Sequence, residues 1–402
     1  MALIEIKNLH TYFKTKKGIV KAVNDVSYSL EPGKTIGIVG ESGSGKSISA
    51  MSILRLLDSN GYIESGEIIF DGKDLTQLSI EEMYEVRGNA ISVIFQEPMT
   101  SLNPVFNVRK QLAEPFKVHQ QAEQAEYEQR VDGEYKEKKL NINAKYDQMV
   151  CDVEASVPEG ADRKAKVAEV NKQRKEELKV AAKEYKKIKN FIDVKVIEML
   201  KAVQIPNPET VARQYPHQLS GGMRQRVMIA MALACKPKIL IADEPTTALD
   251  VTIQAQILKL MNDLQKTNGT SIIFITHDLG VINEMADDVV VMYCGQVVEQ
   301  SSAKIIFSDC KVSHPYTEGL MNSIPRLTKE HQKLEPIPGV VPHPLALPKG
   351  CKFAPRCKYA TEKCMNEEPK LVEVVPGQKI RCFYPNKEER RSEQHKKIVI
   401  NK

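Results

Sequence analysis

The sequence lacks a long uninterrupted apolar run, and this excludes the chain from the proteins that cross a membrane by helices. Its longest apolar stretches, such as residues 227–235, are well short of the ~18 residues that a spanning helix needs. Charged residues also appear early at the N-terminus, at Glu5 and Lys7, which is unlike a secretory signal peptide. We therefore expect the chain to start and stay in the cytoplasm and to serve a membrane only from its surface, through a partner.

A strong charge of one sign is also missing. The formal net charge is +5 over 402 residues, which gives no indication of a nucleic-acid partner. Hydrophobic residues make up 42% of the chain and support a proper core, and the length allows one large domain with an appendage or two domains. No internal repeat is evident.

Disulfides are not expected, because a cytoplasmic chain keeps its thiols reduced. Four cysteines nevertheless lie close together near the C-terminus: Cys351, Cys357, Cys364 and Cys382. They lack the paired C-x-x-C spacing of common zinc sites. Four thiolates so close in sequence can hold Zn²⁺ or a [4Fe–4S] cluster, so spacing alone leaves a cluster, zinc and free thiols open. The surrounding segment has few apolar residues, so a metal would serve as its core.

Short apolar segments alternate with helical patterns over most of the first 300 residues. We expect strands at residues 35–39, 90–95, 238–242, 271–276 and 289–293. This alternation indicates an α/β fold with a largely parallel sheet covered by helices. The first 34 residues differ, because alternating apolar positions and a turn at 31–34 indicate a small antiparallel β subdomain.

Two further segments depart from the α/β pattern. Residues 121–190 are rich in charges of both signs around a break at 157–160, after which apolar residues recur at helical spacing. We interpret them as a charged helical hairpin inserted into the domain, with a partly disordered, solvated loop as the alternative. From residue 301 the periodicity fades and prolines become frequent, so 301–402 is expected to be a small, loop-rich appendage with a charged tail.

One motif predicts a phosphate-binding site. It matches G-x-x-x-x-G-K-S between an expected strand and an expected helix: Gly40, Glu41, Ser42, Gly43, Ser44, Gly45, Lys46 and Ser47. The glycines let backbone N–H groups turn toward phosphates, and the helix N-terminus adds its positive dipole end. Lys46 would reach the β- and γ-phosphates of ATP, and the Ser47 hydroxyl would be a ligand of Mg²⁺.

Polar side chains at other strand ends complete a catalytic set. Asp243 and Glu244 end an apolar run; Asp243 suits Mg²⁺ through water, and Glu244 suits the polarisation of an attacking water. Gln96 could contact both the metal and the water, and His277 could bind the γ-phosphate. Phe13 could stack on adenine, with a core aromatic as the alternative.

With a further glycine-rich run, these motifs resemble the ATP-binding subunits of ABC transporters over residues 1–300. The added residues are the signature Leu219, Ser220, Gly221 and Gly222, the nearby Gln225, and Asp250 of the D-loop. The resemblance implies an ATPase with a P-loop NTPase fold and a helical subdomain at about 98–222. It also implies a head-to-tail dimer in which the signature contacts ATP held by the other subunit, while Asp250 couples the two sites.

A narrower resemblance, to the oligopeptide/dipeptide permease ATPases, rests on motifs outside that common set. They lie at residues 97–104, 215–218, 246–252, 314–317, 323–326 and 337–339. The resemblance implies the D-type ATPase of a peptide importer at the cytoplasmic face of the membrane. Implied partners are a paralogous ATPase, or a second copy of the chain, two membrane permeases and an external peptide-binding protein. The cargo stays open between peptides, nickel and other solutes.

The same subfamily carries a four-cysteine iron–sulfur cluster in its C-terminal region, so the resemblance favours a [4Fe–4S] cluster at the four cysteines, with Zn²⁺ as the alternative. Relatives of this family have a short connection where this chain has about 70 additional residues between Gln111 and Ile197, and this addition has no assigned function. Two rival functions are an ABC ATPase working on DNA or ribosomes and a redox or iron sensor. The first would need a second cassette or a much longer coiled coil.

Overall fold

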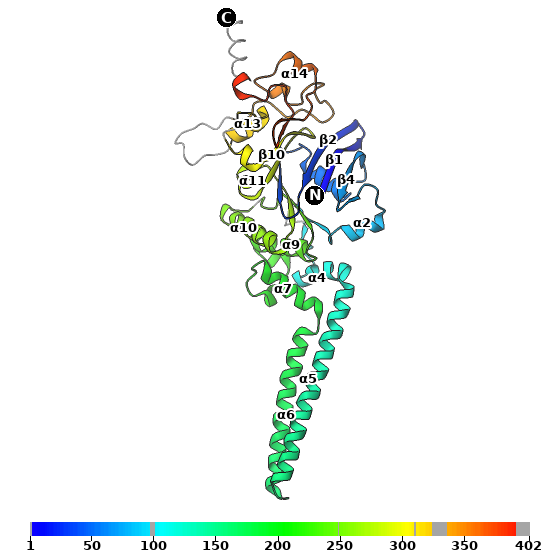
Figure 1. Cartoon of the computed structure of the whole chain (residues 1–402), viewed down its shortest axis with the longest axis vertical. Coiled ribbons are helices and arrows are strands. Elements are labelled where there is room, and N and C mark those ends of the chain that lie inside the picture. The colour runs from blue at the N-terminus through cyan, green and yellow to red at the C-terminus, as the bar shows by residue number, and fades with distance from the viewer. Residues whose placement is uncertain (1, 97–100, 248, 309–310, 324–335, 391–402) are drawn as a thin grey trace. The chain divides into compact units, whose positions relative to one another are not determined.

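The computed structural model describes residues 2–96, 101–247, 249–308, 311–323 and 336–390 (Figure 1). Its packing separates two compact units. The first comprises residues 1–101 and 236–402, and the second comprises residues 102–235. Each unit is described by itself.

The first unit is built on an 8-stranded sheet with the order β11-β12-β10-β9-β3-β8-β7-β6. The strands are β3 (Thr35–Val39), β6 (Ile91–Ile94), β7 (Ile239–Asp243), β8 (Ser271–Thr276), β9 (Asp288–Tyr293), β10 (Gln296–Ser302), β11 (Val372–Val375) and β12 (Gln378–Ile380). β9, β3, β8, β7 and β6 pair in parallel, whereas β10, β12 and β11 extend the sheet in antiparallel fashion. Every residue of β3, β7 and β8 is buried, as expected for parallel strands covered on both faces.

A second, antiparallel sheet lies in the same unit, with the strand order β2-β1-β4-β5. Its strands are β1 (Ile4–Thr15), β2 (Gly18–Leu30), β4 (Gly61–Phe70) and β5 (Lys73–Asp74). Apolar side chains of the two sheets, such as Ile6 and Ile241, belong to one continuous buried core. The antiparallel arrangement expected for the first 34 residues is therefore present and continues through β4 and β5.

The helices of the first unit are mostly short. They are α1 (Lys46–Ile53), α2 (Ile80–Val86), α10 (Val251–Asn268), α11 (Leu279–Met285), α12 (Ala303–Ile306), α13 (Pro315–Asn322), η2 (Ala354–Arg356) and α14 (Glu362–Asn366). Side-chain caps fix where several of them begin: Ser79 and Glu82 form a capping box at α2, and Asp250 caps α10.

The second unit is helical. It contains α4 (Val108–His119), α5 (Gln121–Ser156), α6 (Ala161–Ile188), α7 (Phe191–Ala202), α8 (Pro208–Val211), η1 (Pro216–Gln218) and α9 (Gly221–Leu233). α4, α7 and α9 pack on one another, and Phe116 meets Phe191 edge to face at a centroid distance of 6.4 Å.

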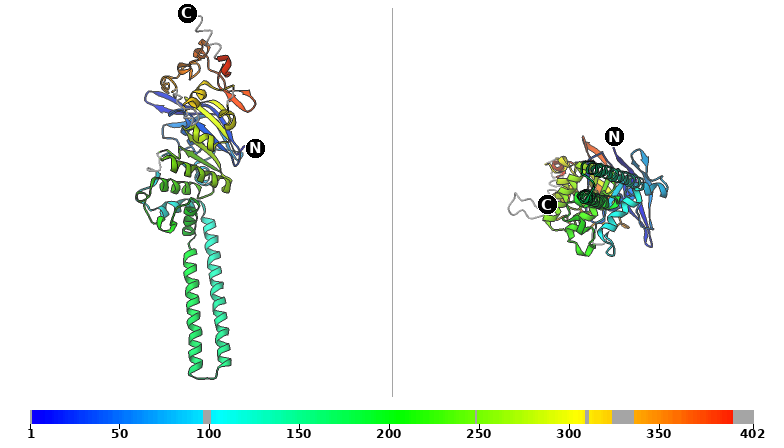
Figure 2. Two further views of the ribbon diagram at one scale, coloured as in Figure 1. Left: turned by 90° about the vertical axis from the view of Figure 1, so that its left-hand side faces the viewer. Right: turned by 90° about the horizontal axis from the view of Figure 1, so that it is seen from below.

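Residues 121–190 contain the two longest helices, α5 and α6, which lie side by side in opposite directions in Figures 1 and 2. Their shared surface buries a small cluster that includes Ile142 and Ala181, and the rings of Tyr135 and Tyr185 stack at 4.2 Å. Ion pairs such as Lys145 with Glu177, 2.9 Å apart, flank the cluster. In the described ranges, no helix has both the length and the apolar character to cross a bilayer.

Part of the C-terminal region belongs to the main sheet. The sequence predicts a loop-rich appendage at 301–402 and does not predict this pairing. β12 pairs with β10, where Ile380 lies opposite Glu299. Glu299 is 1% exposed and accepts hydrogen bonds from Gln378 Nε2 at 2.7 Å and from the His314 backbone N–H at 2.8 Å. Because β12 is so short, its sequence carries no recognisable strand pattern, and the pairing could not be predicted.

Replacing Ile142 with Ala should destabilise the α5–α6 pair by about 2 kcal/mol, because the side chain is 5% exposed and its loss leaves a cavity. Leu140→Ala is the matched control, since that side chain on the same helix is 68% exposed and should cost less than ~0.5 kcal/mol. Native-state hydrogen exchange of the amides in 121–188 measures both changes. Equal effects of the two variants would show that the buried cluster does not hold the helices together.

Candidate functional site

The carboxyl ends of neighbouring parallel strands meet at one edge of the main sheet. Val39 of β3 pairs with Thr276 of β8, and Asp243 of β7 pairs with Ile275. β6 joins β7 in the same direction. The segments that follow these strands therefore start from a common edge, which in open α/β sheets is where ligands bind. They supply residues 40–47, Gln96, Glu244 and His277.

Residues 40–47, called the phosphate loop below, connect β3 to α1. Gly45 has φ +94°, and a Cβ built there would lie 2.4 Å from the carbonyl oxygen of Ala22. Gly40 is equally restricted, because its Cβ would lie 2.2 Å from the carbonyl oxygen of Met292. Glycine is thus required at both positions for the loop to pack closely against neighbouring backbone.

Lys46 lies within the phosphate loop rather than in solvent. Its Nζ donates to the carbonyl oxygens of Gly40 at 2.8 Å and Glu41 at 3.1 Å, and the residue is 5% exposed. Burial lowers the pKa of the ammonium, while the nearby carboxylates, Glu244 foremost, act in the opposite direction. A buried cation at a helix N-terminus with only backbone acceptors suits an anionic ligand.

Ser47 and Asp243 bring two oxygen ligands together. The Ser47 hydroxyl donates to Asp243 Oδ1 at 3.0 Å. Burial raises the pKa of Asp243, and the hydrogen bond from Ser47 opposes that shift. A hydroxyl and a carboxyl suit Mg²⁺, which in phosphate-binding sites usually takes its remaining ligands from water and the phosphates. These two residues therefore fit the predicted metal site.

Glu244 is the centre of a second group of polar side chains. Its Oε2 accepts from Gln96 Nε2 at 3.1 Å and from the Thr247 hydroxyl at 3.0 Å, and its Oε1 lies 3.2 Å from His277 Nδ1. Burial alone would raise the pKa of Glu244, but the hydrogen bonds from His277 and Thr247 and the charge of Lys46 together hold it below its usual range. A lowered pKa favours the ionised carboxylate, which can accept a hydrogen bond or a proton from water.

The backbone at Glu244 is unusual. Its φ of +46° lies in the left-handed region, which residues other than glycine seldom occupy. The Glu244 N–H donates to the Ile275 carbonyl at 2.9 Å, so the neighbouring strand holds this conformation. Such backbone conformations are concentrated at functional sites, where the surrounding structure offsets their cost.

Phe13 and Asp250, two further predicted site residues, both make contacts within the fold. Phe13 lies in β1 opposite Val20 and Gly61, and its ring packs where Gly61 has no side chain. The ring is half-buried, so both adenine stacking and a packing role remain compatible with its position. Asp250 Oδ1 accepts from the Ile253 N–H at 2.9 Å, which fixes the start of α10.

The signature residues lie in the helical unit, at the start of α9. Ser220 is the N-cap and accepts from the Met223 N–H at 3.3 Å, and Gly221 and Gly222 form the first turn. Leu219, which directly precedes the N-cap residue, is buried. Gln225 has no exposed surface, which does not favour the predicted contact with a nucleotide on another subunit.

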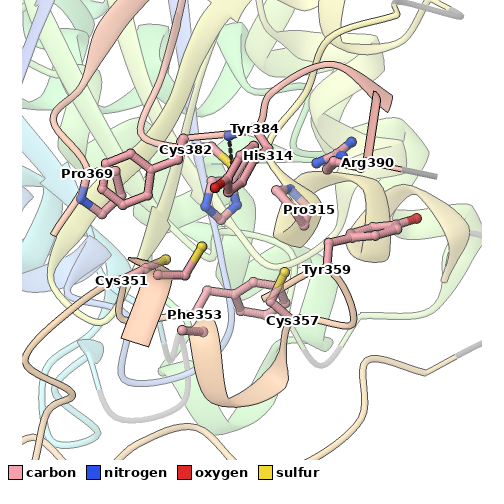
Figure 3. Close-up of a pocket in the computed structure, with 13 residues that line it drawn as sticks. His314, Pro315, Cys351, Phe353, Cys357, Tyr359, Pro369, Cys382, Tyr384 and Arg390 are labelled. Carbon is pink, nitrogen blue, oxygen red and sulfur yellow. Dashed lines mark hydrogen bonds between the residues drawn. The ribbon is translucent and has the colours of Figure 1, made fainter. Parts of the chain in front are cut away.

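The four cysteines line one pocket with a volume of about 20 Å³, together with His314, Arg390 and several aromatic rings (Figure 3). Burial raises the pKa of Cys357 to about 11 and that of Cys382 to about 12. Within the residues that the structure describes, no group of three or more side chains is arranged to hold a metal ion. The structure brings the cysteines together, but the predicted iron–sulfur cluster is not supported by this arrangement.

Sequence reasoning missed two residues of the C-terminal region that contact the phosphate loop. The guanidinium of Arg356 forms a two-pronged ion pair with Glu41, at 2.6 and 3.0 Å, and the Tyr316 hydroxyl accepts from the Glu41 N–H at 2.8 Å. Tyr316 belongs to a motif that was noticed only as a family resemblance. Nothing in the local sequence of Arg356 indicates a partner 315 positions away.

Two family descriptions match the chain. Residues 23–247 match the family described as "ABC transporter", and residues 298–364 match "Oligopeptide/dipeptide transporter, C-terminal region". The first match includes the phosphate loop, Gln96 and Glu244, and the second includes Tyr316 and Arg356.

Curated relatives match over nearly their whole length. The chain is 43% identical over 382 residues to the oligopeptide transport ATP-binding protein AppD of Bacillus subtilis, covering 95% of this chain and 96% of the relative. It is 42% identical to OppD of Haemophilus influenzae, an oligopeptide transport ATP-binding protein, over 95% and 97% of the two chains. Identity to the dipeptide transport ATP-binding protein DppD of the same organism is 41%, over 97% of each chain.

Solved structures share the fold. MJ0796, a dimeric bacterial ABC transporter cassette, gives a TM-score of 0.50 at 23% identity and covers 75% of this chain and 98% of its own. cbiO1 from Clostridium perfringens, part of a cbiONQ transporter complex, gives a TM-score of 0.50 at 23% identity, over 77% and 91%. At this level of identity the comparison concerns the fold alone.

Gly45→Ala should damage the phosphate loop more than Gly43→Ala. Both glycines have positive φ, so each substitution carries a backbone cost of about 1–2 kcal/mol. Only at Gly45 would the new methyl group collide with backbone, whereas no atom lies within 4 Å of a Cβ at Gly43. Denaturant unfolding and ATP-binding titrations of the two variants measure the difference. Indistinguishable variants would show that the close approach to Ala22 is not a constraint.

Proposed function

Since this chain belongs to the ABC transporter family and is an ATPase, we propose that it hydrolyses ATP to energise the import of oligopeptides or dipeptides through membrane permease partners. The observation that carries the proposal is the contact of the Glu244 carboxylate with Gln96, Thr247 and His277 at the strand edge that also holds the phosphate loop. The peptide cargo rests on the relatives, which match over nearly their full length and are named for oligopeptide and dipeptide transport.

In this proposal the phosphate loop holds the nucleotide. Backbone N–H groups of residues 40–47 and the Lys46 ammonium bind the phosphates, and Phe13 stacks on adenine. Ser47, Asp243 and Gln96 would hold Mg²⁺, with Asp243 acting through water. When bound, the metal would supply positive charge that offsets the charge developing on the phosphates.

Glu244 orients the attacking water and accepts a hydrogen bond or proton from it, so that water adds to the γ-phosphorus as the bond to ADP breaks. His277 fixes the Glu244 carboxylate and, in the nucleotide-bound state, binds the γ-phosphate. Gln96 Nε2 donates to the same carboxylate at 3.1 Å, which supports a role for its amide beside the metal and the attacking water.

We further propose that two ATPase subunits close on ATP head to tail. Ser220 and Gly222 of one subunit would then contact the γ-phosphate bound at Lys46 of the other, and Asp250 would link the two sites. The other subunit is a paralogous ATPase, with a second copy of this chain as the alternative. Because these contacts exist only in the closed dimer, ATP would favour closure and hydrolysis would favour opening.

The domain assignment is also a proposal. It consists of an ATPase domain at 1–300 with a helical subdomain at about 98–222, an insertion at about 121–190 and a C-terminal region at 301–402. The two permeases would contact the helical side at the cytoplasmic face of the membrane, and an external peptide-binding protein would act indirectly. The loop from Gln96 to Val105 would pass the motion of closure to the permeases, and residues 97–100 of this loop lie outside the described residues.

The iron–sulfur cluster at the four cysteines stays a hypothesis that rests on family resemblance. The gathering of the four side chains around one pocket favours a shared ligand. The absence of a metal-holding group among them, in the ranges described, is unfavourable. Zinc and free thiols are the alternatives, and no step of the ATPase mechanism is assigned to the cysteines.

Glu244→Gln should lower the ATP hydrolysis rate by at least ~100-fold, because the amide cannot accept a proton from water. ATP affinity should change little, since Lys46 and the phosphate loop remain. Glu284→Gln, a substitution at an exposed position of α11, is the matched control and should hydrolyse ATP at the parental rate. Phosphate release and equilibrium ATP binding measure the two properties, and hydrolysis by Glu244→Gln at the parental rate would remove Glu244 from its assigned role.

Cells carrying Glu244→Gln in place of the parental chain should also lose uptake of labelled dipeptides or oligopeptides. Uptake of ⁶³Ni²⁺, measured in parallel, separates the peptide proposal from the nickel alternative. Loss of nickel uptake with peptide uptake intact would reassign the cargo. If both kinds of uptake are unchanged, the transporter proposal itself is wrong.

The cluster hypothesis expects about four iron atoms and matching acid-labile sulfide per full-length chain purified without oxygen. Cys382→Ser should lower both contents, whereas Cys151→Ser, at an exposed position of α5, should leave them unchanged. Metal analysis of the three proteins is the measurement. Zinc without iron, or neither metal, would each reject the cluster.

A further inference from the structure

The backbone N–H, the backbone carbonyl and the side-chain carboxylate of Glu41, in the phosphate loop, each form a hydrogen bond or an ion pair. Its carbonyl oxygen accepts from Lys46 Nζ at 3.1 Å and from the Ser44 N–H at 3.2 Å. Its N–H donates to the hydroxyl of Tyr316, and its carboxylate meets the guanidinium of Arg356. Lys46 and Ser44 are partners within the loop, whereas Tyr316 and Arg356 are partners from the C-terminal region. Glu41 therefore connects that region to Lys46.

Contacts other than the ion pair with Glu41 also fix the side chain of Arg356. Its side chain is 5% exposed, and its Nε donates to the Pro338 carbonyl at 2.9 Å. The guanidinium also lies over the rings of Tyr293 and Phe353, 5.8 and 6.0 Å from their centroids. A guanidinium fixed in this way loses little conformational freedom on forming a two-pronged pair with a carboxylate.

Tyr316 is held equally firmly. It is fully buried in α13, and its ring packs against Tyr293 at a centroid distance of 4.7 Å and against Phe353 at 5.4 Å. Its hydroxyl is therefore a fixed acceptor for the Glu41 N–H. Without this acceptor, the partly buried Glu41 N–H would need another partner.

The charge of Glu41 gives these contacts a functional consequence. A carboxylate in a loop that binds the phosphates of ATP repels them, and the Glu41 side chain is only 28% exposed, so solvent screens this repulsion incompletely. The positive charge of Arg356 offsets the charge of the carboxylate by pairing with it. The main-chain position of Glu41 also matters, because its carbonyl is one of the acceptors that hold Lys46.

We propose that Arg356 and Tyr316 are positioning residues for ATP binding, and that they act through Glu41 to fix the phosphate loop and to neutralise its acidic side chain. The C-terminal region is then part of the nucleotide site, although its residues need not touch the nucleotide. This inference deepens the proposed function and rests on residues 40–47 as the ATP site.

Arg356→Gln in the full chain should weaken Mg·ATP binding about tenfold, because Glu41 is left unpaired beside the phosphates. Removing both charges, in Glu41→Gln with Arg356→Gln, should restore much of that affinity, so the two substitutions should be clearly non-additive. Isothermal titration with Mg·ATP measures the affinities. An Arg356→Gln affinity within twofold of the parent, or strictly additive effects, would overturn the proposal.

Tyr316→Phe is an independent variant in case the loss of Arg356 prevents folding. It removes only the hydroxyl that accepts from Glu41 and should weaken Mg·ATP binding about threefold. An unchanged affinity in this variant would remove Tyr316 from the assigned role.

Lys352→Gln is the matched control within the same region. It breaks the ion pair of Lys352 with Glu368, 2.7 Å long, which does not include the phosphate loop. ATP affinity should stay at the parental value, and a loss equal to that of Arg356→Gln would show that any damage to the C-terminal region has the same effect. Lys46→Ala tests the ATP site at residues 40–47 separately from the role of Arg356. If this variant binds ATP like the parent, the ATP site itself is wrongly assigned, whatever the effect of Arg356→Gln.

Discussion

The parallel register of β3, β8 and β7 is the constraint on which the rest of the site depends. Because Val39 lies opposite Thr276 and Asp243 opposite Ile275, the chain leaves all these strands at the same edge. The positions of the phosphate loop, of the hydrogen-bonded Ser47 and Asp243, and of the group around Glu244 follow from that register. A buried parallel sheet also tolerates no slip, since every residue of these strands is covered on both faces.

The parts of the fold and site that could be predicted from the sequence are those in which local pattern and chemistry coincide. The phosphate loop was recognisable because its glycines, lysine and serine are required at fixed spacing between a strand and a helix. Glu244 was recognisable because it ends an apolar strand. The helices at 121–156 and 161–188 were predicted less securely, because their buried cluster is small and most of their surface is charged.

What could not be predicted depends on contacts between distant parts of the chain. β12 is too short to show a strand pattern, and its place beside β10 follows from backbone pairing and the buried Glu299. The ion pair of Arg356 with Glu41 has no local signal either. The four cysteines are a case in which the sequence predicts more than the structure supports. Their clustering and the family resemblance predict a metal cluster, whereas in the described residues they line a pocket without forming a metal-holding group.

The central claim is that ATP lies between two ATPase subunits, held by the phosphate loop of one and capped by the signature of the other. The measurement that tests it most directly is a structure of the full chain with Mg²⁺ and a slowly hydrolysed ATP analogue, formed with its paralogous subunit or a second copy. We expect the γ-phosphate to contact Lys46 of one protomer and the serine of the signature in the other. A nucleotide enclosed by a single protomer, with Ser220 distant from every bound phosphate, would contradict the account.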